Sequence, residues 1–252
     1  MTADFRHDQV RAYYRTLYAA WGPQHWWPAR TPFEVIVGAY LTQNTSWKNV
    51  EHALHRLRQK RLLSLAAVRR ASIKQLGKAV RPAGYYRQKA AGLKIFVAFV
   101  DRHYRGSLRR MFAQPTEQLR EELLGLHGVG PETADSILLY AGQHPVFVVD
   151  AYTRRILERH KLLPADAGYE EIRQLFERAL SDPATSLDQW RNTHGKRETG
   201  FAHPPSPMSL AKRSSQGQVF NDLHGLVVAA GKHYCHKSNP RCQQCPLQRF
   251  LP

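Results

Sequence analysis

Apolar residues recur at the spacing of an α-helix along most of this chain. In residues 8–20, for example, Val10, Tyr14 and Leu17 fall on one helical face. A strand-like run occurs from Val146 to Val149, but a single strand has no partner for its backbone groups. The sequence therefore predicts an all-α fold. Helices are expected over residues 8–20, 33–44, 46–59, 73–79, 85–104, 117–125, 131–142, 151–160, 169–181 and 217–232.

Capping residues mark several of the expected helix starts. Ser46 is placed to cap the helix that follows it, and Ser72 with Gln75 has the spacing of a capping box. Thr116 is expected to cap residues 117–125, and Pro131 stands where a first helical residue often does.

The helical pattern breaks over residues 191–216, where Pro, Gly, Ser and charged residues replace the apolar periodicity. Such a segment is typical of a mobile loop or insertion. It serves either as a binding element or as a plain linker, and its composition favours a linker.

The 252-residue length suits one large domain or two small interlocked ones, and 42% hydrophobic residues is normal for a globular protein. No apolar run approaches the ~20 residues that a membrane span requires. The first ten residues lack the apolar stretch of a secretory signal. We therefore expect no membrane contact and no secretion, and a cytoplasmic protein that is nucleoid-associated if its source is bacterial.

The net charge is strongly positive, at +17. A soluble protein this basic usually binds a polyanion, and nucleic acid is the first candidate. The alternative is a basic surface without such a partner.

Residues 117–142 form the pattern of two helices joined by the turn His127-Gly128-Val129-Gly130. Two glycines one residue apart let the chain reverse tightly and bring bare backbone close to a ligand. The second helix then begins at Pro131, with its unsatisfied N–H groups and positive dipole end at the turn, which suits a DNA phosphate. Such a contact positions a protein without reading bases. Val129 is expected to fill apolar space between the helices, and the alternative is a plain helix–helix turn.

The segment LHGVGPETADSILLYAGQHPVFVVD resembles the helix–hairpin–helix, Gly/Pro-rich loop and Asp signature of the endonuclease III superfamily of DNA glycosylases. In that superfamily an aspartate follows the hairpin after a short apolar stretch, and Asp150 stands 20 residues after Gly130. AYLTQNT, residues 39–45, resembles the superfamily's early barrel helix. The likeness covers most of residues 26–250.

The resemblance implies a two-domain, all-α, endonuclease III-like architecture. Residues 33–143 would form a six-helix barrel with the helix–hairpin–helix. Residues 1–32 and 144–252 would form a second, helical domain of the iron–sulfur type, with the C-terminal cysteine loop. The DNA would lie across the groove between the two, with Asp150 at its mouth.

A glycosylase breaks the C1′–N bond of a base stacked in a duplex, so the nucleotide must first be flipped out. Cleavage builds positive charge on the sugar, which a nearby carboxylate stabilises, and an attacking water can pass its proton to the same carboxylate. The resemblance assigns this role to Asp150. By itself, an Asp before a helix is also a typical N-cap, and the two roles are compatible.

Superfamily members that also cut the strand carry a Lys two residues after the second hairpin glycine, where this chain has Glu132. A carboxylate cannot form the imine that strand cleavage needs. The resemblance therefore implies weak or absent lyase activity. Glu132 is either a first-turn acid favoured by the helix dipole or a pocket residue that contacts the flipped base or holds a water.

Tryptophans crowd the stretch before residue 33, and Trp47 follows LTQNT. Dense tryptophans often serve as core mass, but an electron-rich ring also suits a cationic alkylated base. The surrounding segments most resemble the endonuclease III-like 3-methyladenine DNA glycosylases, in which residues matching Trp26 and Trp47 sandwich the base. Trp27 is expected in the core. By the same resemblance, Gln43 is the candidate that fills the space left by the flipped base; alternatively it is a polar residue at a helix end.

The three cysteines, Cys235, Cys242 and Cys245, are odd in number and clustered, which favours metal binding over disulfides. Their spacing resembles the superfamily's [4Fe–4S] loop. The fourth Cys would stand at Leu251, and leucine cannot ligate iron. Three thiolates at this spacing still argue for a cluster.

The fourth iron would need a non-Cys group or solvent, and His233 and His236 are near in sequence. A three-iron cluster, zinc held by three Cys and one His, and a loop without a cluster remain alternatives. Lys232 beside this loop is a candidate phosphate contact, or part of a solvated basic loop.

The resemblance, together with the basic charge and the hairpin, implies a DNA N-glycosylase of base excision repair. It would hydrolyse the C1′–N bond of an alkylated purine such as 3-methyladenine with the help of Asp150. The expected partner is double-stranded DNA with a damaged base or an abasic site, bound by a monomer. One alternative is a bifunctional endonuclease III-type glycosylase and lyase acting on oxidised pyrimidines. Another is a catalytically weak homologue that binds lesions without cutting.

Overall fold

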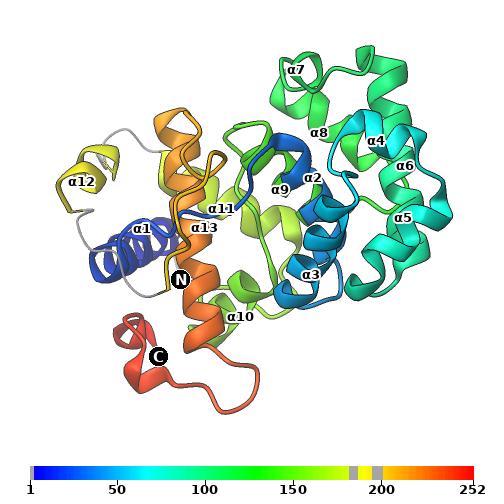
Figure 1. Cartoon of the computed structure of the whole chain (residues 1–252). Helices are drawn as coiled ribbons and strands as arrows, with labels where there is room; N and C mark the ends of the chain where they lie inside the picture. Colours follow the sequence, from blue (N-terminus) through cyan, green and yellow to red (C-terminus); the bar gives the residue numbers. More distant parts are fainter. Residues whose placement is uncertain (1–2, 182–186, 195–200) are drawn as a thin grey trace. The chain divides into compact units, whose positions relative to one another are not determined.

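The computed structural model describes residues 3–181, 187–194 and 201–252, which are helical along most of their length and contain no β-strand (Figure 1). This confirms the predicted all-α class. The helices are α1 Ala3–Trp21, α2 Pro32–Thr42, α3 Trp47–Gln59, α4 Leu65–Arg70, α5 Ile73–Val80, α6 Tyr86–Tyr104, α7 Leu108–Met111, α8 Thr116–Leu124, α9 Pro131–Ser136, α10 Ala151–Arg159, α11 Tyr169–Ser181, α12 Leu187–His194 and α13 Ser215–His233.

Local capping chemistry explains where several helices begin. Ser46 caps α3 through the Asn49 amide, and Ser72 and Gln75 form the expected capping box of α5. The expected cap of α8 is wrong. Pro115 is the N-cap residue and offers no side-chain bond, whereas Thr116 is already the first helical residue.

The predicted helix over residues 131–142 divides in two. The α-helical part, α9, ends at Ser136, and Ile137–Ala141 continue as one wider π-helical turn. All five residues of that turn are buried. The short helices α4, α7 and α12 were not predicted, because so few turns carry too little periodic signal.

The strand-like run from Val146 to Val149 is extended but pairs with no strand. Its backbone is satisfied by side chains of α11 instead: the Phe147 amide donates to Glu177 Oε1 at 2.9 Å, and the Val149 amide donates to the Tyr169 hydroxyl at 3.3 Å. Buried backbone groups need partners, and here side chains supply them.

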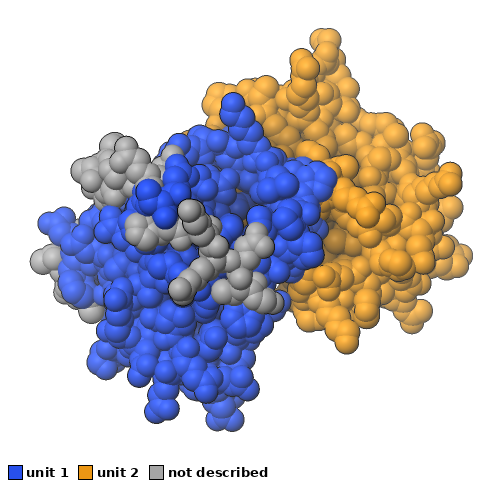
Figure 2. All heavy atoms as spheres, turned by 60° about the vertical axis from the view of Figure 1, so that its left-hand side comes forward, with its two compact units in different colours: residues 1–28, 143–252 blue, residues 29–142 orange. Residues whose placement is uncertain are grey.

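The described chain forms two compact units (Figure 2). Unit 2 is the continuous stretch of residues 29–142, with a core in which α2 packs on α3 and α6. Unit 1 is assembled from residues 1–28 and 143–252, with α1 packed on α11 and α13, and α10 packed on α13.

The predicted loop over residues 191–216 is shorter in the structure. Residues 191–194 belong to α12 and residues 215–216 to α13, while residues 195–200 lie outside the described part. The described remainder is anchored, because the Ser206 hydroxyl donates to the Trp27 carbonyl at 3.2 Å and Arg213 donates to three carbonyls of its own segment.

Candidate active site and DNA-contact elements

The predicted site residues divide between the two units. Unit 1 carries Trp26, Asp150, Lys232 and the cysteine loop, and unit 2 carries Gln43, Trp47, Glu132 and the glycine hairpin.

The hairpin of unit 2 joins α8 to α9 through an exposed loop. Gly128 has a φ of +81°, the left-handed region that glycine adopts without strain, whereas Gly130 is extended with a φ of −94° and is the N-cap residue of α9. The left-handed conformation therefore favours glycine at Gly128, whereas any residue could adopt the backbone conformation of Gly130. A Cβ atom on either glycine would meet open space. Val129 is buried as expected, and His127 is exposed.

A buried ion pair braces this hairpin. Arg120 of α8 holds the Asp135 carboxylate of α9 with two hydrogen bonds, from Nε at 2.6 Å and from Nη2 at 3.2 Å. The Asp135 side chain is fully buried. Two-point pairing of this kind fixes the angle between the two helices.

Gln43 lies at the C-terminal end of α2 and reaches the hairpin. Its side-chain amide donates to the Gly128 carbonyl at 2.9 Å and to the Thr133 hydroxyl at 2.9 Å. The residue predicted to fill the space of a flipped base is thus held against the glycine hairpin.

Lys89 of α6 holds the same end of α2. Its ammonium donates to the carbonyls of Leu41, Gln43 and Ala83 at 2.8, 2.8 and 2.7 Å. Burial lowers the pKa of Lys89 to about 8. Sequence reasoning missed this residue, although a lysine in register with the apolar face of a helix was a usable signal.

Glu132 is exposed in the first turn of α9, where the helix dipole favours an acid. Trp47 is half-buried as the first residue of α3.

Asp150 of unit 1 is the N-cap of α10. Its Oδ1 accepts from the Thr153 amide at 2.7 Å and from the Thr153 hydroxyl at 2.9 Å. The helix-cap interpretation is therefore confirmed, and it leaves the second carboxylate oxygen, Oδ2, available for another role. The side chain is 12% exposed.

His224 of α13 faces that second oxygen, with Nε2 3.8 Å from Asp150 Oδ2. Burial lowers the pKa of His224, and the Asp150 carboxylate opposes this effect. The imidazole is therefore neutral near pH 7. Sequence reasoning missed His224, and the available signal was a histidine inside a nearly apolar helix.

Trp26 and Trp27 are both buried, at 8% and 4% exposed. Burial of Trp27 agrees with its expected place in the core. The Trp26 ring lies 5.2 Å from the His203 ring, between centroids. Gly225 of α13 lies beneath Trp26, because a Cβ atom there would stand 3.0 Å from the Trp26 Cβ.

The three cysteines line one small cavity together with Leu251, the residue at the position of the absent fourth Cys. Burial raises the pKa of the Cys245 thiol, and the Cys235 and Cys242 thiols act in the same direction. Arg159 of α10 donates to the Cys235 sulfur at 3.0 Å. Hydrogen bonds to thiolate sulfurs are typical of iron–sulfur centres.

This cavity has a volume of about 10 Å³, room for about one water molecule. Within the described ranges, no group of three or more His, Cys, Asp or Glu side chains is arranged to hold a metal ion. The donor chemistry thus fits a cluster at three positions, but the loop would have to open to admit one. Lys232 is exposed in the last turn of α13.

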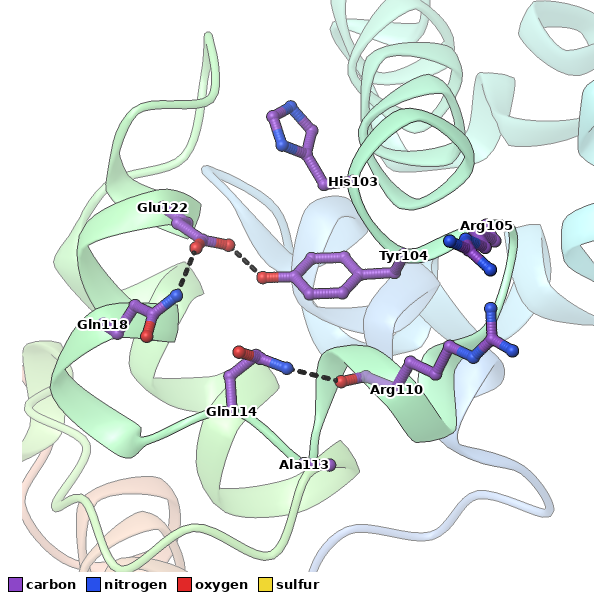
Figure 3. Close-up of a pocket in the computed structure, with 8 residues that line it drawn as sticks. All are labelled: His103, Tyr104, Arg105, Arg110, Ala113, Gln114, Gln118 and Glu122. Atoms are coloured by element: carbon purple, nitrogen blue, oxygen red, sulfur yellow. Dashed lines mark hydrogen bonds between the residues drawn. The ribbon is translucent and has the colours of Figure 1, made fainter.

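A separate hollow of about 510 Å³ lies on unit 2 among α6, α7 and α8 (Figure 3). Tyr104 points toward Glu122 and donates to its carboxylate, and the other oxygen accepts from Gln118 at 3.0 Å. None of the predicted site residues lines this hollow.

Among the helices of the described residues, none combines the length and apolar character that crossing a membrane requires.

Comparisons with known proteins agree with these features. The model of the HhH-GPD superfamily of base excision DNA repair proteins matches residues 37–182, more than half of the chain. The chain is 37% identical over 245 residues to "Putative DNA repair glycosylase MJ1434" of Methanocaldococcus jannaschii, covering 96% of each protein.

Among solved structures, the chain resembles the 3-methyladenine DNA glycosylase of H. pylori bound to 1,N6-ethenoadenine. The two are 25% identical with a TM-score of 0.70, over 90% of this chain and 97% of that one. A non-covalent endonuclease III–DNA complex has the same fold, at 20% identity and a TM-score of 0.69, over 100% of this chain and 95% of that one. The predicted superfamily is confirmed: the chain belongs to the HhH-GPD superfamily of base excision DNA repair proteins, to which endonuclease III-like glycosylases belong.

Proposed function

We propose that this protein is a monofunctional DNA glycosylase, which removes a damaged base from double-stranded DNA and leaves an intact abasic site. The observation that carries the proposal is the geometry of Asp150. One carboxylate oxygen is held by the first turn of α10, while Oδ2 accepts no hydrogen bond from the described residues. A fixed, partly exposed carboxylate suits the stabilisation of a positively charged sugar.

In the proposed reaction the C1′–N bond breaks and its electron pair leaves with the base. The Asp150 carboxylate stabilises the positive charge that develops at C1′. A water then adds its oxygen to C1′ and gives a proton to Asp150, which returns it to solvent. The exposed hairpin loop and the N-terminus of α9 would hold a backbone phosphate, independently of sequence.

Glu132 supports a reaction without strand cleavage, because a carboxylate cannot form an imine with the sugar. Lys89 is a buried lysine of unit 2 whose pKa is lowered, as an imine-forming amine requires. Its nitrogen, however, donates to three backbone carbonyls. It therefore does not replace the missing hairpin lysine.

The proposed substrate is an alkylated purine such as 3-methyladenine. The observation that supports it is the solved relative from H. pylori, a 3-methyladenine glycosylase at 25% identity. In this proposal the electron-rich rings of Trp26 and Trp47 would contact the cationic base.

We also propose that Cys235, Cys242 and Cys245 hold a [4Fe–4S] cluster, with a fourth position not filled by Cys. Such a cluster would bind the C-terminal loop through three thiolates and contribute to the stability of unit 1. Arg159 supports this proposal by its hydrogen bond to the Cys235 sulfur. No step of base removal depends on the cluster.

The test is a panel of duplexes with one lesion each: 3-methyladenine, hypoxanthine, uracil or thymine glycol. Base release is scored separately from strand cleavage. We expect 3-methyladenine to be released, with strands that break only after alkaline treatment. Asp150→Asn should slow release on the order of 10²–10⁴-fold while duplex binding persists.

Efficient trapping of a covalent protein–DNA adduct by borohydride would contradict the monofunctional assignment and favour the bifunctional alternative. Tight lesion binding with no release from any duplex would favour the lesion-binding alternative.

A further inference from the structure

α13 contacts two residues of the proposed site from adjacent positions. His224 stands 3.8 Å from the Asp150 carboxylate, and Gly225 lies against the backbone end of the Trp26 side chain. One turn of one buried helix therefore contacts both Asp150 and Trp26. None of the resemblances used above assigns a role to His224.

The Asp150 carboxylate is constrained from two sides. Thr153 holds Oδ1 with two hydrogen bonds, so rotation of the carboxylate is restricted and Oδ2 is directed toward His224. The imidazole is itself fixed, because it is 4% exposed and packs edge-on against the Phe147 ring at 6.3 Å between centroids.

We infer that His224 is a positioning residue, which orients the Asp150 carboxylate toward the reacting sugar through an Nε2–H directed at Oδ2. This inference rests on the proposed function of Asp150. At 3.8 Å the contact is longer than a hydrogen bond, so in the free protein it acts as an oriented dipole. Catalytic contacts often shorten when substrate binds.

A neutral imidazole suits this role better than a charged one. An imidazolium would neutralise the carboxylate that must face a positive sugar, whereas a neutral N–H orients it and leaves its charge in place. The lowered pKa of His224 agrees with this requirement.

Two substitutions of similar size separate positioning from packing. His224→Gln keeps an N–H donor near the place of Nε2, and His224→Leu fills the space without a donor. Single-turnover base release, duplex affinity and thermal unfolding are measured for both variants, for the wild type and for Asp150→Asn. The substrate is the lesion duplex on which the wild type acts.

We expect His224→Leu to release base on the order of 10–100-fold more slowly, as for other residues that orient a functional group. His224→Gln should recover most of that rate, and both variants should bind duplex DNA like the wild type. A His224→Leu variant as fast as the wild type would overturn the inference while leaving Asp150 in place. Equal losses in both variants, with lower melting temperatures, would assign His224 to packing and also overturn it. A wild type that releases no base from any lesion would overturn the proposed function and this inference together.

Discussion

The hairpin of unit 2 and the cysteine loop of unit 1 are held in different ways. Protein groups alone hold the hairpin: the Arg120–Asp135 pair braces its two helices, and Gln43 joins it to α2. The cysteine loop receives hydrogen bonds from Arg159, yet its three thiols gather around a cavity that they do not fill. The hairpin is therefore held by contacts within the protein, whereas the cysteine loop would gain its main cross-link only from the proposed cluster.

The largest expected effect concerns the brace of the hairpin. Arg120→Met would leave the fully buried Asp135 carboxylate without its paired charge, and breaking a buried pair costs about 3–5 kcal/mol. Thermal unfolding of the variant should show this loss. Arg69→Ala is the matched control, because it breaks an exposed pair with Asp101, which water screens, and should lower stability far less. Similar losses in the two variants would show that burial does not distinguish the pairs.

A smaller effect is expected at Lys89, and it depends on pH. Lys89→Met removes the shared donor of three carbonyls, and we expect a total cost of about 1–3 kcal/mol, the cost of one carbonyl that stays unsatisfied. An ordinary lysine keeps its proton to about 10.5, but Lys89 in the folded chain releases it at about 8. Between these values the unfolded chain binds more protons, so the stability contribution of this group rises with pH.

The difference between the melting temperatures of the wild type and of Lys89→Met should therefore grow in favour of the wild type as the pH rises from 8 toward 10.5. A constant difference across this range would contradict the lowered pKa. Lys94→Met is the matched control, since Lys94 also donates to three carbonyls, at the end of α4, but is less buried.

Substitutions at the two hairpin glycines distinguish the effect of backbone strain from that of the proposed DNA contact. Gly128→Ala forces a side chain into the left-handed region, at a cost of roughly 1–2 kcal/mol. Gly130→Ala should leave stability unchanged, because its φ suits any residue and its Cβ meets open space. Both should weaken binding to all duplexes alike if a phosphate approaches this backbone. Gly130→Ala protein that binds undamaged duplexes like the wild type would refute the phosphate contact.

The smallest expected effect tests whether the two regions are independent. Cys245→Ser should abolish iron binding, measured by metal analysis and by visible absorption of the purified protein. Affinity for an undamaged duplex should change little, because contacts within unit 2 alone hold the hairpin that is proposed to meet the phosphate. Stoichiometric zinc and no iron in the wild type would contradict the cluster, and a large loss of affinity in the variant would contradict the independence.

The fold was largely predictable because the signals of a helix, apolar periodicity and capping residues, lie within the helix itself or beside it. Periodic apolar residues located α1 and α13, and side-chain caps such as Ser46 located helix starts. The short helix α12 escaped because two turns carry little periodicity, and Thr116 misled because Pro115 before it can also begin a helix.

The candidate site was only half predictable, because its supports are distant in sequence. Gly128, Glu132 and Asp150 lie within one motif that can be recognised. His224, in contrast, meets Asp150 from 74 positions further along the chain, and no local sequence pattern indicates such a contact. The usable sequence signal for such a contact is a polar residue in register with the apolar face of a helix.

The division of the chain into units affects the order in which the protein can fold during synthesis. Unit 2 is one uninterrupted stretch, so its contacts are complete once residue 142 has left the ribosome. Unit 1 needs α11 and α13, so the apolar face of α1 with Tyr14 and Leu17 must wait for segments made last. Exposed apolar surface of this kind promotes aggregation. The contacts of the glycine hairpin can therefore form during synthesis while the first helix still lacks its partners.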